Sequence, residues 1–326
     1  MKESHFVHTK ESEWSEFLTS LDRLESRWNK GKSTNADGFT DRYRRIAHDL
    51  TIARTRGYSN QLIDRLNNLV QRGHNLLYTN RLGWVHGFLN FFTHSFPQSV
   101  RSQKLYILLS VLAFVGPGLG MSYMISTQPE FVHTVLSDEQ LYQLQEMYDP
   151  NSERRSVKRD ADENIEMFGH YILNNTSIGL LVFINGLVFG IGSIIVLAFN
   201  GIFIGSVITY LCIAGYSSTV LPFVIGHGAF ELTAIVIAGA AGLRMAKGVF
   251  IPGVYARKTS IKIASKEAFL LCGGFFTMFI LAAFIEAFWS PRDFLPNSIK
   301  YSVGLLLWIA VLYYFLFVGR DKHSHR

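Results

Sequence analysis

Six long apolar stretches occupy most of the sequence after residue 104. A helix needs about 20 apolar residues to cross the hydrocarbon core of a bilayer, and all but the third stretch reach about that length. The third stretch is short, so we expect it to be tilted, re-entrant or joined to the fourth stretch. The pair Asn200-Gly201 is a turn signal, which separates the third stretch from the second. We therefore predict an all-α polytopic membrane bundle of about six spans. The stretches cover residues 105–125, 177–199, 201–214, 220–243, 268–289 and 299–318.

Charge is scarce in this chain and is distributed unevenly. Only 17% of its residues are charged, whereas soluble domains contain about 25%. Residues 1–104 carry 16 Lys and Arg, while residues 127–172 carry 10 Asp and Glu and 4 Lys and Arg. Because basic segments stay in the cytoplasm, we expect the first segment inside and the second outside. Six spans then keep both termini in the cytoplasm.

The polar N-terminal third has the periodicity of helices. Apolar residues recur every three or four positions in residues 11–30, 40–56 and 59–78, which predicts a cytosolic three-helix domain over residues 1–81. Its basic residues form either a partner or phosphate surface or an ordinary solvated helix face. The residues of this surface are Arg42, Arg44, Arg45, Arg54 and Arg56, together with the acidic Asp49.

Two further segments are predicted outside the spans. Residues 82–104 are rich in aromatic side chains, which is typical of an amphipathic helix in the membrane interface, although another bundle helix fits as well. Residues 127–172 have helical patterning in two places. We interpret them as an extracytoplasmic helical hairpin, for which a solvated connector is the alternative.

Few ionisable residues lie inside the predicted spans of the 105–326 membrane domain. His227 and Glu231 are four residues apart on the fourth span and share a helix face. Glu286 lies near the outer end of the fifth span, and Asn174 and Asn175 open the second at its outer end. Because ionisable groups in a bilayer are costly, these five residues define a candidate polar site in the outer half of the membrane.

The chemistry of this site stays open at this point. Two carboxylates and an imidazole are able to carry a proton or cation, ligate a metal, act as general acid and base, or hydrogen-bond across helices to fix their register. One His-x-x-x-Glu pair is a weak metal motif, and no nucleophile paired with a base is visible. We therefore assign no catalytic residue, no metal and no cofactor. Gly226, directly before His227, is compatible with a helix start whose dipole favours an anion.

Several runs of sequence together resemble a known family. NNTSIGLLVFINGLVFGIGSIIVLAFNGIFIGSV begins at Asn174, and GHGAFELTAIVIAGAAGLRMAKG begins at Gly226. The runs DLTIARTR and FIEAFWSP fit the same pattern, which is similar to that of the stage II sporulation protein M family of integral membrane proteins. Family members usually have Pro where this chain has Gly226. The resemblance implies as signature positions Asn174, Asn175, Asn200, Gly201, His227, Gly228, Glu231 and Glu286.

The resemblance also carries an expectation of function. In spore formers the family member works with cell-wall hydrolases during engulfment, while the sequence itself contains no feature of sporulation. Nucleotide-binding, metalloprotease and serine-hydrolase motifs of soluble enzymes are missing. We expect a non-enzymatic membrane scaffold or complex subunit linked to cell-envelope processes, and the alternatives are a transporter or channel and an intramembrane hydrolase.

The expected partners follow from the same features. They are the lipid bilayer and proteins of a membrane complex, and the sequence leaves a homo-oligomer open. The net charge of +6 adjoins apolar spans without a basic-aromatic module, so no nucleic acid is expected.

Overall fold

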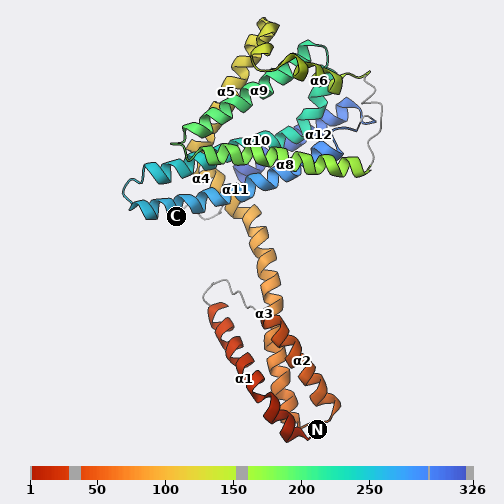
Figure 1. The fold of residues 1–326 in the computed structure, drawn as a ribbon, viewed down its shortest axis with the longest axis vertical. Helices are drawn as coiled ribbons and strands as arrows, with labels where there is room; N and C mark the ends of the chain where they lie inside the picture. Colours follow the sequence, from red (N-terminus) through yellow and green to blue (C-terminus); the bar gives the residue numbers. More distant parts are fainter. Residues whose placement is uncertain (1, 29–37, 152–160, 293, 321–326) are drawn as a thin grey trace. The chain divides into compact units, whose positions relative to one another are not determined.

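The computed structural model describes residues 2–28, 38–151, 161–292 and 294–320. These residues are mostly helical and contain no strand, which confirms the all-α prediction. The chain divides into two compact units, Met1–Asn90 and Phe91–Arg326 (Figure 1). Each has a hydrophobic core of its own.

The N-terminal unit consists of the three helices that the periodicity predicts. They are α1 (Glu3–Trp28), α2 (Phe39–Thr55) and α3 (Asn60–Asn90). Large side chains such as Trp14 fill its core, and the Trp14 indole N–H donates to the buried Asp49 carboxylate at 3.0 Å. The side chains of Trp28 and Leu77, which the periodicity also predicts inward, lie outside the described residues. The core contains Phe6, Trp14, Phe17, Leu21, Phe39, Ile46, Leu50, Ala53, Leu62, Leu66 and Leu69.

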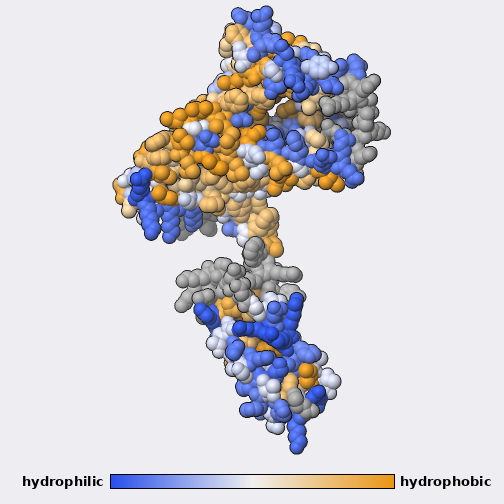
Figure 2. Space-filling model, viewed as in Figure 1, coloured by the Kyte–Doolittle hydropathy of each residue, from blue (hydrophilic) through white to orange (hydrophobic). Residues whose placement is uncertain are grey.

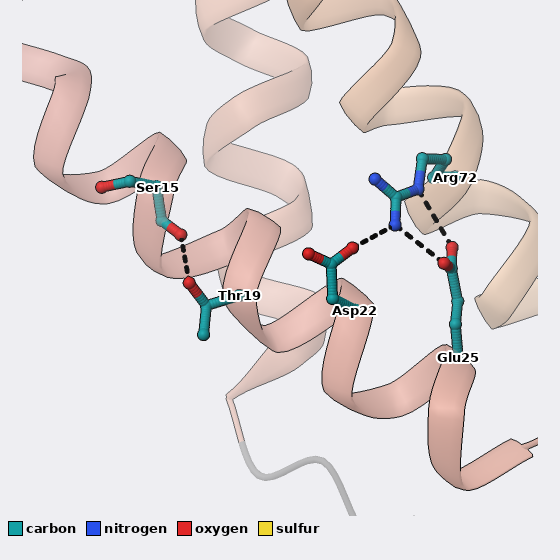
Figure 3. Close-up of polar contacts among 5 residues, drawn as sticks. All are labelled: Ser15, Thr19, Asp22, Glu25 and Arg72. Carbon is teal, nitrogen blue, oxygen red and sulfur yellow. Dashed lines mark hydrogen bonds and ion pairs between the residues drawn. The ribbon is translucent and has the colours of Figure 1, made fainter.

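Ion pairs join α1 to α3 on the surface of this unit. Figure 3 shows Arg72 of α3 bridging Asp22 and Glu25 of α1, with two parallel hydrogen bonds to Glu25. These carboxylates, Glu25 first, raise the pKa of Arg72. A second ion pair joins the same two helices. In it Arg65 of α3 donates twice to Glu11 of α1, and this hydrogen bonding lowers the pKa of Glu11. Bidentate arginine–carboxylate pairs of this kind fix the register of α1 against α3.

Residues 82–104 are shared between the two units rather than forming one helix. α3 continues to Asn90, and a π-helical turn, η1 (Phe91–Ser95), leads into α4 (Phe96–Ser102). Phe96 is buried in the core of the second unit, and Arg101 donates to the last carbonyls of its final helix. These contacts make α4 part of the bundle, which agrees with the alternative interpretation of this segment. A location in the membrane interface stays a prediction, and the Trp84 side chain lies outside the described residues.

The second unit contains six helices long and apolar enough to cross a membrane, which confirms the predicted number. α10 lies at the centre and packs against the other five. In Figure 2 a broad apolar area covers the left and centre of the visible surface of this unit, as expected for contact with lipid, and hydrophilic residues gather at its top and right. The spanning helices are α5 (Lys104–Thr127), α8 (Ala161–Asn185), α9 (Ile191–Ile213), α10 (Ser217–Phe250), α11 (Arg257–Phe288) and α12 (Asn297–Phe317).

The predicted turn at Asn200-Gly201 is wrong. The chain turns instead at 186–190, where Phe189 (φ 52°) and Gly190 (φ 78°) adopt left-handed backbone, so the third spanning helix has 23 residues and is not short. Asn200 lies inside α9, and its side-chain amide donates to the carbonyl of Val196 four residues back. Gly201 serves packing, because a Cβ there would overlap the backbone of Phe114 in α5. Figure 1 shows α5 and α9 side by side.

The described part of residues 127–172 is mostly helical, and the predicted hairpin stays a prediction. This part contains a short 3-10 helix, η2 (Pro129–Thr134), then α6 (Asp138–Tyr148), and finally the first turns of α8. A small cluster around Val132 and Leu141 packs on the adjoining ends of α5 and α9. The pattern before Tyr171 thus belongs to a spanning helix, while residues 152–160 lie outside the described part of the chain.

Helix α10 starts nine residues before Gly226, so the predicted helix start at Gly226 is wrong. The helix begins at Ser217 and includes Pro222. A proline in this position leaves the carbonyl four residues before it without its usual donor. Here the side chain of Asn297 donates to that carbonyl, Ser218 O, at 2.8 Å. One continuous helix therefore carries the residues around His227.

Candidate functional site

The candidate site begins with two residues of α10. His227 is 5% exposed, and its Nε2 lies 3.8 Å from Oε2 of Glu231 one turn further along. The spacing of four residues places both side chains on one helix face. The Phe223 ring packs edge-on against the imidazole, with the two ring centroids 5.4 Å apart.

Helix α11 adds a second carboxylate to this pair. It packs antiparallel along α10, as the contacts of Gly226 with Ile285 and of Gly248 with Ala264 indicate. One ligand atom each from His227, Glu231 and Glu286 lies within 4.8 Å of the other two. The three ionisable residues that the sequence singles out are therefore brought together, at the end of the bundle where α10 begins and α11 ends.

Two residues that sequence reasoning missed complete the surroundings of the imidazole. Ser290, just past the end of α11, places its Oγ 3.2 Å from Nδ1 of His227. Lys300, in the first turn of α12, is buried and donates from Nζ to the carbonyl of Ser290 at 2.8 Å. A lysine inside an apolar span was the available signal for Lys300. Ser290 carried none, because its position depends on the turn between α11 and α12.

The asparagine pair lies in the middle of α8 rather than at its start. Asn175 is 2% exposed, whereas Asn174 is exposed and donates from Nδ2 to Asn175 Oδ1 at 3.2 Å. α8 and α10 run parallel and touch at Gly186 and Gly242. Asn175 and Glu231 each lie eleven residues before that contact (186 − 175 and 242 − 231), so they are level along the bundle. The structure therefore places Asn175, but not Asn174, on the buried side of α8 at the height of the cluster.

The glycines of the expected signature have different surroundings. Gly201 and Gly118 approach so closely that a Cβ on Gly118 would lie 2.8 Å from the carbonyl oxygen of Gly201. Such small residues let spanning helices pack backbone to backbone. Gly226 faces Ile285 of α11 and Trp289, the residue after α11, at ordinary contact distance. Nothing in the structure explains Gly228, whose neighbours at this range belong to its own helix.

The cluster offers cation-binding and proton-transfer chemistry in a closed setting. Two carboxyl groups supply oxygen atoms, the imidazole supplies nitrogen atoms, and the Lys300 side chain reaches the carbonyl of Ser290 beside them. The Ser290 hydroxyl places a nucleophilic group beside the imidazole, which the sequence did not reveal, yet Ser290 is only 1% exposed. A substrate for acyl transfer must reach that oxygen, so the observed arrangement is better suited to a small ion than to a large substrate.

Comparison with known protein families gives two matches, one in each unit. A family model described as Stage II sporulation protein M matches residues 107–291, more than half of the chain. A second, described as Domain of unknown function (DUF8413), matches residues 4–79 in the N-terminal unit. No curated protein and no solved structure matches significantly.

Proposed function

Because this chain belongs to the stage II sporulation protein M family and is a multi-pass membrane protein, we propose that it is a non-enzymatic scaffold or complex subunit linked to cell-envelope processes. It acts in the bacterial cytoplasmic membrane, with the N-terminal unit and the C-terminus in the cytoplasm. An even number of spans and the basic character of residues 1–104 support this orientation.

The observation that carries the proposal is the solvent-exposed side of α2 and its C-cap, called the α2 face, which presents the exposed arginines Arg42, Arg44, Arg45, Arg54 and Arg56. Arg65 and Arg72 on α3 are held by carboxylates of α1. On the α2 face, Arg42 bonds to the hydroxyl of Ser20, and Arg54 bonds to the side-chain oxygen of Asn67.

The single ion pair described on this face is also weak. It joins Arg44 to Asp41 at 3.7 Å, and both side chains are about three-quarters exposed. Exposed pairs of this kind contribute little, so the face keeps positive charge for a partner. An acidic protein surface matches it by charge complementarity.

Affinity purification of the full-length chain tests this proposal. Membranes are solubilised in several mild detergents, and the wild type is compared with the variant Arg44→Glu/Arg45→Glu. The matched control is Arg257→Glu/Lys258→Glu, which reverses the same charge on exposed residues of the second unit. We expect the same proteins to be captured in each detergent, to be lost from the α2 variant and to be retained by the control. Recovery of the chain alone in every detergent would refute the scaffold.

A transporter or channel is the second candidate, and the cluster of His227, Glu231 and Glu286 favours it. In liposomes, proton or cation flux should then require Glu231 and Glu286, and Glu231→Gln and Glu286→Gln should each abolish it while leaving the fold intact. An intramembrane hydrolase ranks last because Ser290 is buried. Absence of flux in the wild type, together with captured partners, separates the scaffold from the transporter.

A further inference from the structure

We propose that His227, Glu231 and Glu286 bind one divalent transition-metal ion of the zinc or manganese class. The site lies inside the second unit, Phe91–Arg326, which we call the membrane unit. This proposal is independent of the scaffold function. It starts from the convergence of three ligand atoms, an imidazole nitrogen and two carboxylate oxygens, within 4.8 Å of one another. One nitrogen and two oxygens suit Zn²⁺ or Mn²⁺, whereas Ca²⁺ requires six or more oxygen ligands.

The distances require little movement to close around an ion. Three atoms that are all within 4.8 Å of one another lie at most about 2.8 Å from a common point, and zinc bonds to nitrogen and oxygen are about 2.0–2.2 Å long. Each atom therefore has to move by about 0.7 Å or less. The Nε2–Oε2 distance of 3.8 Å between His227 and Glu231 is already close to the separation of about 3.4 Å in a tetrahedral site.

The imidazole is also oriented as metal-binding histidines are. A histidine ligand usually has its second ring nitrogen hydrogen-bonded to a neighbour, which fixes the tautomer and the ring plane. In this protein Nδ1 of His227 faces Oγ of Ser290 at 3.2 Å, which leaves Nε2 directed at Glu231. Ser290 is itself fixed by Lys300, which donates to its carbonyl. This support comes from residues outside the ligand set.

Charge and polarity around the cluster favour a cation with a polar fourth ligand. Two carboxyl groups and an imidazole gathered in a bilayer are costly unless they are paired or bind a cation. Three protein ligands leave one coordination position open for water or an anion. Asn175 lies level with Glu231, and its buried Nδ2 forms no hydrogen bond with any residue that the structure describes. That amide is an unused donor at the same height of the bundle as the cluster.

Metal content of the full-length chain tests the proposal. Because His323 and His325 near the C-terminus are able to bind metal themselves, all proteins carry His323→Ala and His325→Ala and no histidine tag. The chain is stripped with a chelator in detergent and reloaded with Zn²⁺ or Mn²⁺, and bound metal is measured by mass spectrometry. Co²⁺ loading adds a visible spectrum that reports ligand geometry.

We expect about one ion per chain in this background, and loss of that ion in Glu231→Gln and in Glu286→Gln. The matched control is Glu267→Gln, which removes the same charge from α11 19 residues before Glu286 and should keep the ion. Absence of metal from the well-folded wild type, or equal metal in the wild type and both site variants, would overturn the proposal and leave a protonated polar network.

A second variant keeps the proposal testable if the carboxylate variants do not fold. Ser290→Ala retains all three ligands and removes only the group that orients His227. We expect its metal affinity to fall by about 10–100-fold, with one ion still bound at saturation. An affinity equal to that of the wild type would contradict the assignment of His227 as an oriented ligand.

Discussion

The two units of this protein pack their helices by different means. In the N-terminal unit, large side chains such as Trp14 and Phe17 fill the space between α1, α2 and α3. In the membrane unit, glycines such as Gly201 and Gly186 bring helix backbones into direct contact. Water drives the first kind of packing by expelling apolar surface. Lipid offers no such drive, so close fit and polar contacts replace it.

Buried polar groups differ between the units in the same way. The N-terminal unit buries the carboxylate of Asp49 and bonds it to Trp14. The membrane unit gathers His227, Glu231 and Glu286 in one place. A single paired group serves stability, while a cluster of three ionisable side chains in a membrane favours a function. Substitutions in each unit should therefore fail for different reasons.

The largest expected effect is in the N-terminal core. Trp14→Ala removes a fully buried side chain and should lower the free energy of unfolding of that unit by about 4 kcal/mol. Trp14→Phe keeps most of the packing but removes the donor to Asp49, and should cost about 1–3 kcal/mol. Hydrogen exchange at increasing urea concentration, followed by mass spectrometry, measures α1–α3 and α8–α11 separately.

Because the two cores share no residue, the exchange of α8–α11 serves as the internal control for Trp14→Ala. Equal destabilisation of both sets of helices would contradict independent cores.

A smaller effect is expected where α5 and α9 touch. Gly201→Ala places a methyl group against the backbone of Phe114, so the helices must separate, which costs about 2 kcal/mol. Gly120→Ala in α5 is the matched control, because a Cβ there meets open space, and we expect a change within about 0.5 kcal/mol. Unfolding by a denaturing detergent, followed by circular dichroism, gives both values. Equal stability of the two variants would show that this contact is not required.

The architecture could be predicted from sequence because both units have strong periodic signals. The spacing of Trp14, Phe17 and Leu21 predicts the buried face of α1. The number of long apolar stretches predicts the number of spanning helices. The turn between α8 and α9 could not be predicted, since apolar residues surround it on both sides. Its location rests on the left-handed backbone at Phe189 and Gly190. A sequence signal for a turn at Asn200 was overridden by packing of α9 on α5.

The candidate site could be predicted in part, for similar reasons. His227 and Glu231 share a face by helix spacing alone, and span order brings Glu286 to the same end. Ser290 and Lys300 depend on the path of the chain between α11 and α12, which no short-range pattern encodes. Asn174 and Asn175 differ in burial because neighbouring residues of a helix point about 100° apart, and only packing shows which of them faces the bundle.

The smallest expected effect tests the surface electrostatics of the N-terminal unit. Glu11→Gln weakens the fork with Arg65, and since both side chains are over 40% exposed the loss at neutral pH should stay below about 1 kcal/mol. Glu16→Gln on the exposed face of α1 is the control, with an expected change within about 0.5 kcal/mol.

This difference between the wild type and Glu11→Gln should depend on pH in a defined direction. Hydrogen bonding from Arg65 lowers the pKa of Glu11 below its ordinary value of 4.5. A group with a lowered folded-state pKa stabilises the fold above its unfolded pKa, and this contribution is lost as the pH falls through the folded value. Urea titrations monitored by hydrogen exchange of α1–α3 should therefore show a constant difference from neutral pH to about pH 4.5 that shrinks below it. A difference that grows towards acid would contradict the assigned pair, since protonation of the carboxylate removes the charge that Arg65 binds.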